Sequence, residues 1–156
     1  MIMAAIAVSF VWTSCAAQSK DFKEIELSSQ NGGQMKLSET VRDNKYTFLV
    51  FWASWCGPCM REVPFQVEAY KKYKDKGFEI YGVSLDDDPA SWRATTSERG
   101  MSWIQVSDLA GWASPAASQY GVRSIPTNFL IDRKGNIVAK NLRGGDLEAK
   151  LSELLK

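Results

Sequence analysis

The sequence predicts one α/β domain whose mixed, largely parallel sheet is covered by helices on both faces. The chain has 156 residues, which is the size of a single domain. Hydrophobic residues make up 45% of it and charged residues 24%, so the chain can bury a substantial core and is not expected to be disordered. Apolar runs typical of strands alternate with segments of helical periodicity, and this alternation favours parallel strands joined by crossover helices.

The first half of the domain is expected to contain a hairpin, a central strand and a long helix. Two short apolar segments flank Asn31-Gly32-Gly33, and they extend from Phe22 to Leu37. Glycines at such a point supply the positive φ of a hairpin turn. Residues 46–52, YTFLVFW, form a continuous run typical of a fully buried strand. A helix is expected over 56–76, where apolar side chains recur every three or four residues.

The second half repeats this alternation and closes with a hairpin and a helix. Residues 78–85 read as a strand, and the acidic cluster 86–88 followed by Pro89 reads as the start of a helix that runs to about Arg99. The remaining expected elements are a strand at 102–106, a helical turn at 116–120, a hairpin made of 128–132 and 136–139, and an amphipathic helix from Asp146 onward.

The composition restricts the chemistry that the chain can perform. It has 0 His, so it lacks the imidazole base of serine and cysteine hydrolases and the usual ligand of catalytic zinc. Basic and acidic residues number 19 and 18, and this balance makes nucleic acid an unexpected partner. The 3 Cys are too few for a disulfide-stapled miniprotein. No metal and no cofactor is expected.

Residues 1–19 are expected to be an export segment with a short tether, and residues 20–156 the folded domain. The apolar run 1–12 would span about 18 Å as a helix, which is short of the roughly 30 Å core of a membrane and suits an export signal. Cys15 follows small residues, as in a bacterial lipoprotein processing site. A plain secretory signal and an uncleaved membrane-associated stub are the alternatives to lipid attachment at Cys15. All three place the domain in the cell envelope or periplasm.

Cys56 and Cys59 carry the strongest chemical signal in the sequence. Cys56 would lie at the N-terminus of the predicted helix, where unpaired N–H groups and the helix dipole stabilise a thiolate. Cys59 follows one turn later, close enough to form a disulfide. Half of a zinc site and an inert buried pair are the alternatives. Zinc would need two further ligands that the chain lacks, and inertness does not explain a position at the start of a helix.

Residues 51–59, FWASWCGPC, closely resemble the active-site segment of the thioredoxin family, and the resemblance continues to the C-terminus. Residues 121–127, GVRSIPT, resemble the segment that carries the cis-proline of that family. The resemblance implies that Pro126 is cis and that the backbone of Ile125 pairs with a substrate strand. An ordinary trans loop proline is the alternative. Trp55 either shapes the same substrate surface or only packs.

Two departures from thioredoxin resemble the exported TlpA/ResA type of thiol–disulfide oxidoreductase. Val50 stands where thioredoxin has a buried Asp, and the residues between 88 and 115 read as a central α/β insertion. The C-x-P-C-x-x-E-x-P pattern of that type fits residues 56–64. The resemblance implies that Glu62 serves the dithiol, and helical spacing places it near the face of Cys59, where it can accept a proton. A solvated helix glutamate is the alternative. Trp103 and Trp112 are expected to pack in the core or in loops.

The resemblance therefore implies a thioredoxin fold and an exported protein-disulfide reductase. Cys56 is expected to attack a disulfide of a client protein, and Cys59 to resolve the mixed disulfide. Apocytochrome c and other envelope proteins are candidate clients, and a membrane thiol transporter is the expected electron donor. A thiol peroxidase of the peroxiredoxin type is an alternative, but it requires Pro and Thr or Ser where the chain has Leu49 and Ala53. A non-catalytic thioredoxin-fold binding domain is the second alternative.

Overall fold

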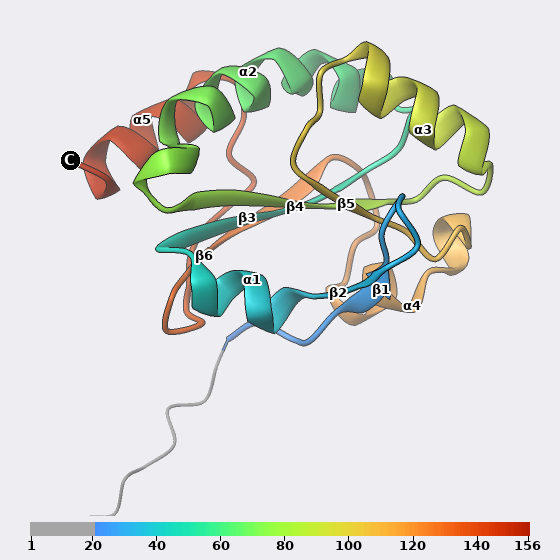
Figure 1. Cartoon of the computed structure of the whole chain (residues 1–156), viewed down its shortest axis with the longest axis horizontal. Coiled ribbons are helices and arrows are strands. Elements are labelled where there is room, and N and C mark those ends of the chain that lie inside the picture. The colour runs from blue at the N-terminus through green and yellow to red at the C-terminus, as the bar shows by residue number, and fades with distance from the viewer. Residues whose placement is uncertain (1–20) are drawn as a thin grey trace, which may run out of the picture.

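The computed structural model describes residues 21–156, which form a five-stranded mixed sheet with helices on both faces (Figure 1). The strands lie in the order β5-β4-β3-β6-β7. The first three are parallel to one another, and β6 and β7 are antiparallel to their neighbours. Their bounds are β3 (Tyr46–Trp52), β4 (Phe78–Ser84), β5 (Ile104–Val106), β6 (Thr127–Asp132) and β7 (Ile137–Lys140). The expected mixed sheet is confirmed.

The central strand β3 is buried along nearly its whole length. It covers the apolar run predicted as a strand, and every residue from 47 to 52 is buried. Helices cover both of its faces, so side chains on either side of the strand leave water, which explains why β-branched and aromatic residues follow one another without polar alternation. The end of β3 at Trp52 is therefore a rigid position from which the following loop leaves the sheet.

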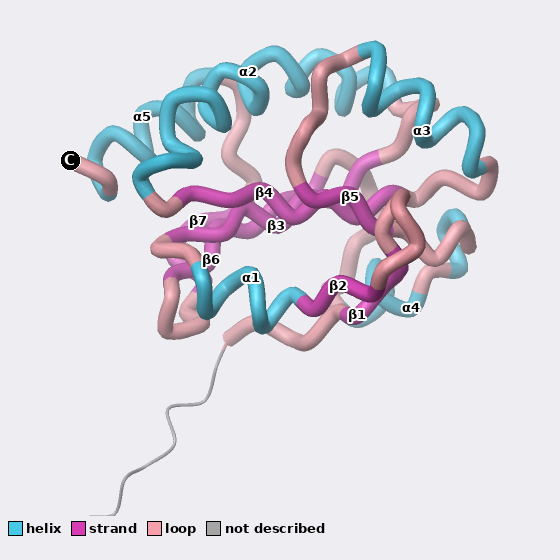
Figure 2. The backbone as a smooth tube through the Cα atoms, viewed as in Figure 1, coloured by secondary structure: helices cyan, strands magenta, loops and turns pink. Residues whose placement is uncertain are grey.

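Helices and short turns form two layers around this sheet (Figure 2). One face is covered by α2 (Gly57–Tyr73), α3 (Pro89–Glu98) and α5 (Gly145–Leu154). The other is covered by α1 (Leu37–Asp43) and α4 (Pro115–Gln119). The long helix was predicted to Lys76, and the structure continues α2 as a 3-10 turn, η1 (Lys74–Lys76), that ends at Gly77 with φ of 94°. No helix in this described part of the chain is long and apolar enough to cross a membrane.

The N-terminal hairpin consists of β1 (Glu26–Ser28) and β2 (Gln34–Lys36), which pair antiparallel as predicted. The placement of Leu37 in this hairpin was wrong, because Leu37 begins the unpredicted helix α1. That helix is short, and Lys36 at its N-cap makes no side-chain capping bond. A carboxylate oxygen of Glu24 instead accepts a hydrogen bond from the Ser38 N–H at 3.0 Å. The helix therefore lacks the local start signal from which a helix is predicted.

The segment between 88 and 115 adds the predicted α/β unit to one edge of the sheet. It forms α3, β5 and a 3-10 turn, η2 (Gly111–Ala113). The carboxylate of Asp88 caps α3 by accepting hydrogen bonds from the N–H groups of Ala90 and Ser91. The turn η2 follows the edge strand β5 in the chain and precedes α4.

Candidate functional site

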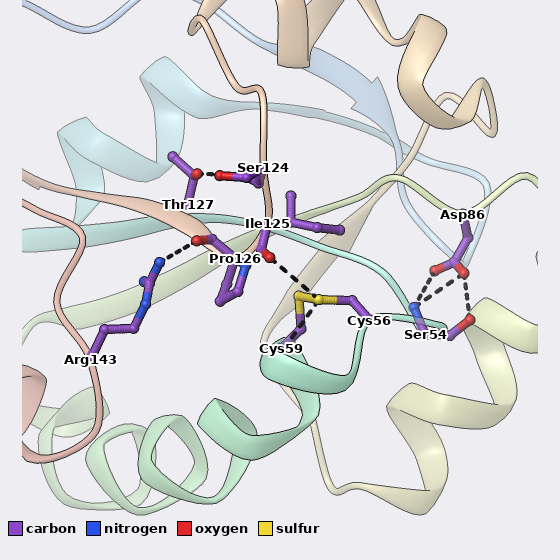
Figure 3. The surroundings of a disulfide bond; sticks show 9 residues. All are labelled: Ser54, Cys56, Cys59, Asp86, Ser124, Ile125, Pro126, Thr127 and Arg143. Carbon is purple, nitrogen blue, oxygen red and sulfur yellow. Dashed lines mark hydrogen bonds between the residues drawn. A yellow bond between two sulfur atoms is a disulfide. The ribbon is translucent and has the colours of Figure 1, made fainter.

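Cys56 and Cys59 are joined by a disulfide where the chain passes from β3 into α2 (Figure 3). Their Cα atoms are 5.2 Å apart. Cys56 is the N-cap residue of α2, and its Sγ accepts a hydrogen bond from the Cys59 N–H at 3.2 Å. Pro58 occupies the first turn, where its missing N–H costs no helical hydrogen bond. The turn geometry therefore holds both sulfurs within bonding distance.

The surroundings of Cys56 favour a thiolate when the disulfide is reduced. The N-terminus of α2 contributes its dipole, and the first turn of this helix holds no acidic residue. The Arg61 guanidinium lies over Gly57, 3.8 Å from the point that a Cβ there would occupy. The helix N-terminus places partial positive charge at the sulfur, which is the environment in which cysteines react. Both cysteines are buried, with 4% of the surface of Cys56 and 2% of that of Cys59 exposed.

The segment opposite the disulfide contains the cis peptide bond between Ile125 and Pro126. The Ile125 carbonyl oxygen lies 3.6 Å from the Sγ of Cys56. Two hydrogen bonds fix this segment, as Figure 3 shows. The Thr127 hydroxyl donates to the Ser124 carbonyl at 2.7 Å, and the Arg143 guanidinium donates to the Pro126 carbonyl. The structure thus brings together the two segments that the sequence analysis singled out.

Glu62 is half-buried on α2 and contacts the loop that precedes α5. Its Oε2 accepts a hydrogen bond from the Gly144 N–H at 2.7 Å. Gly144 has φ of 52° and directly follows Arg143, which holds Pro126. Glu62 is therefore linked to the cis-proline segment through two adjacent loop residues. Sequence analysis missed Arg143 and Gly144, because a contact across 82 residues leaves no local signal.

Asp86 is a buried carboxylate that fixes the loop before the disulfide, and its interpretation as part of a helix-start cluster was wrong. It is 1% exposed and accepts hydrogen bonds from the Ser54 N–H and hydroxyl and from the Ser84 hydroxyl. Only Asp88 of the cluster caps α3. Since β3 and β4 are parallel, their carboxyl ends meet at one edge of the sheet, and this rule would have placed Asp86 beside Ser54.

Trp55, directly before Cys56, is 56% exposed, and its ring centroid lies 6.4 Å from that of Trp112 in η2. Trp112 packs in a turn rather than in the core, which is one of the two expected placements, and 51% of its surface is exposed. Trp103 is buried as expected. Cys15 and the proposed export segment lie outside the described residues. Within residues 21–156, no cluster of three or more Asp, Glu or Cys side chains is placed to hold a metal ion.

The sheet order and the position of the disulfide together define the thioredoxin fold. The chain belongs to the AhpC/TSA family, whose model matches residues 19–140. Among solved structures, a thiol-disulfide oxidoreductase from Bacteroides fragilis NCTC 9343 superimposes with a TM-score of 0.79 at 36% sequence identity. That match covers 85% of this chain and 98% of the other.

Curated relatives of this chain carry the name thiol-disulfide oxidoreductase ResA. The relative from Bacillus subtilis strain 168 is 30% identical over 129 residues, which is 83% of this chain and 69% of the relative. A relative from Bacillus thuringiensis subsp. konkukian is 34% identical over 112 residues, or 72% of this chain. This chain spans 62% of the length of that relative.

Proposed function

We propose that the protein is a thiol–disulfide oxidoreductase that reduces disulfides of client proteins through Cys56 and Cys59. The observation that carries this proposal is the disulfide at the N-terminus of α2, with the Cys56 sulfur 3.6 Å from the Ile125 carbonyl. A catalytic disulfide needs one sulfur at a polar, electropositive position and a second within reach of it, and this turn supplies both. The names of the ResA and Bacteroides relatives support the same activity.

The reduced protein would act in two exchange steps. The Cys56 thiolate attacks one sulfur of the client disulfide, so that a Cys56–client bond forms, the client S–S bond breaks and one client thiolate leaves. The Cys59 thiolate then attacks the Cys56 Sγ, which forms the Cys56–Cys59 disulfide and releases the second client thiolate. Two electrons pass from the dithiol to the client, whose two thiolates take up protons.

The surrounding residues would position the client and move one proton. The backbone of Ile125 is available to pair with an extended client segment, because its carbonyl lies beside the reacting sulfur rather than inside a sheet ladder. Pro126 lacks an N–H, so it offers this segment no competing donor. Glu62 would accept the proton of Cys59 before the second step. One of its oxygens holds Gly144, which leaves the other for this proton.

The proposal extends to the cellular location of the protein. We propose that residues 1–19 direct export, that Cys15 carries lipid, and that the domain of residues 20–156 works in the cell envelope. There it would reduce proteins such as apocytochrome c and take electrons from a membrane thiol donor. A mass measurement of the mature protein tests the first part: a chain that begins at a lipid-modified Cys15 is expected. A mature chain that retains Met1 would contradict processing.

The activity is tested by mixing the reduced protein with a protein disulfide at equal concentration. We expect client thiols to appear while the Cys56–Cys59 disulfide forms at the same rate, both measured by alkylation and mass spectrometry. Hydrogen peroxide replaces the protein disulfide in a parallel reaction. If the protein were a non-catalytic binding domain, its dithiol would be oxidised in neither reaction. If it were a peroxidase, the Cys59→Ser variant would still consume hydrogen peroxide. Either result would contradict the reductase.

A further inference from the structure

Two exposed tryptophans form a contiguous aromatic surface beside the disulfide. Large hydrophobic side chains that are exposed within residues 21–156 are few, and two of them, Trp55 and Trp112, contact one another. Their ring planes are inclined by 52°, within the range of favourable aromatic pairs. Trp55 is bonded directly to Cys56, so this surface adjoins the sulfur that the proposed function places in contact with the client. Exposed apolar patches of this kind mark interaction sites.

The loop that carries Trp55 is fixed by hydrogen bonds to the buried carboxylate of Asp86. Ser54 donates its N–H to the Asp86 carboxylate at 3.1 Å, and its hydroxyl donates to the same group. Asp86 also accepts a hydrogen bond from the Ser84 hydroxyl at 2.6 Å. Ser84 is the last residue of β4, so the network connects this loop to the central sheet.

The loop that carries Trp112 is also anchored on Ser84. The Ser107 hydroxyl donates to the Ser84 carbonyl at 2.8 Å, directly after β5. Further along, the Ser114 hydroxyl donates to the Asp108 carboxylate at 2.6 Å, and this bond spans η2. Ser84 therefore fixes the position of one tryptophan through its hydroxyl and the position of the other through its carbonyl. The two loops that carry the rings are therefore fixed relative to each other and to Cys56.

We infer that Trp55 and Trp112 form a docking surface for an apolar side chain of the client, located next to the client's reactive cysteine. This inference rests on the proposed function, because a client that delivers its sulfur to Cys56 must lay its neighbouring residues against Trp55. Two indole rings offer apolar area without a charge of their own, so a Phe, Leu or Met side chain fits better than a polar one. Binding costs little ordering entropy, because the two loops are already fixed.

The test compares two peptide disulfides that differ only in having Phe or Ser beside the cysteine. The full chain should reduce the Phe peptide with the higher kcat/KM. Trp112→Ala should lower the Phe-to-Ser ratio of kcat/KM by about tenfold, which is the effect of losing most of the burial of one large apolar side chain. Trp112→Phe keeps an aromatic face and should lower the ratio less. Phe65→Ala is the matched control and should leave the ratio unchanged, because Phe65 is a similarly exposed aromatic residue, 49% exposed, whose ring lies against Gly144.

The possible outcomes separate this inference from the proposed function. Equal kcat/KM values for the two peptides in the unaltered protein, or an unchanged ratio in Trp112→Ala, would overturn the docking surface and leave the reductase in place. Reduction of neither peptide would overturn both. Sedimentation of the same samples tests whether a second copy of the chain occupies this surface instead of a client. A dimer that Trp112→Ala dissociates would overturn the inference and assign the tryptophans to a contact between two copies. A thermal unfolding midpoint of Trp112→Ala close to that of the unaltered protein shows that the variant folds.

Discussion

Replacement of Cys59 by serine is expected to leave the protein covalently bound to its client. Cys56 keeps its position at the helix N-terminus and can still attack, but a serine hydroxyl cannot displace the client from Cys56. A well-placed intramolecular group acts at an effective concentration of about 10⁵ M or more, so millimolar external thiol replaces it poorly. Turnover should fall by at least about 10³-fold, and mixed disulfides should accumulate on Cys56. Non-reducing electrophoresis of envelope extracts, followed by mass spectrometry, measures these adducts.

The matched control for this variant is Cys56→Ser. It removes the attacking sulfur and leaves Cys59, which lacks the N-cap position that stabilises a thiolate at Cys56. Little client should be captured, because the remaining sulfur is the weaker nucleophile. Equal capture by both variants would show that the adducts form by non-specific oxidation. Absence of adducts with Cys59→Ser, in extracts that contain oxidised client proteins, would contradict the two-step mechanism.

The elements that could be predicted from the sequence are those whose structure is determined by residues close together in the chain. The uninterrupted β-branched and aromatic run at 46–52 coincides with β3, because a strand buried on both faces favours such residues at successive positions. The long helix was predicted as far as Lys76 because Gly77 adopts a positive φ that few other residues tolerate. Because the strand and the helix were both predicted, the position of Cys56 between them could be predicted as well.

Features that depend on contacts between distant segments were not predicted. Asp86 was assigned to a helix start because two acidic neighbours follow it, whereas its true partner, Ser54, lies 32 residues earlier in the chain. The exposure of Trp112 depends on where Ser107 and Asp108 anchor the loop around it. Composition and periodicity report burial along one element, and they carry no information on which loops meet at the edge of a sheet.

Glu62→Gln is expected to slow the second exchange step and leave the fold intact. The glutamine side-chain oxygen can still accept the hydrogen bond that Gly144 donates to Glu62 at 2.7 Å, so the loop before α5 keeps its position. An amide cannot take the proton of Cys59, and loss of a general base slows proton transfer by about 10²-fold or more. Stopped-flow measurement of Cys56–Cys59 disulfide formation, starting from a preformed mixed disulfide, isolates this step.

Two further variants decide between a proton acceptor and a loop support at this position. Glu68→Gln on the same helix removes an exposed carboxylate that pairs with Lys71 at 3.4 Å, and it should leave the rate unchanged. Glu62→Ala removes both the proton acceptor and the contact with Gly144, so it should slow the step as Glu62→Gln does and also lower the unfolding free energy by about 1 kcal/mol. If Glu62→Gln keeps the full rate while Glu62→Ala is slow, the carboxylate supports the loop that carries Arg143, and another group accepts the proton of Cys59.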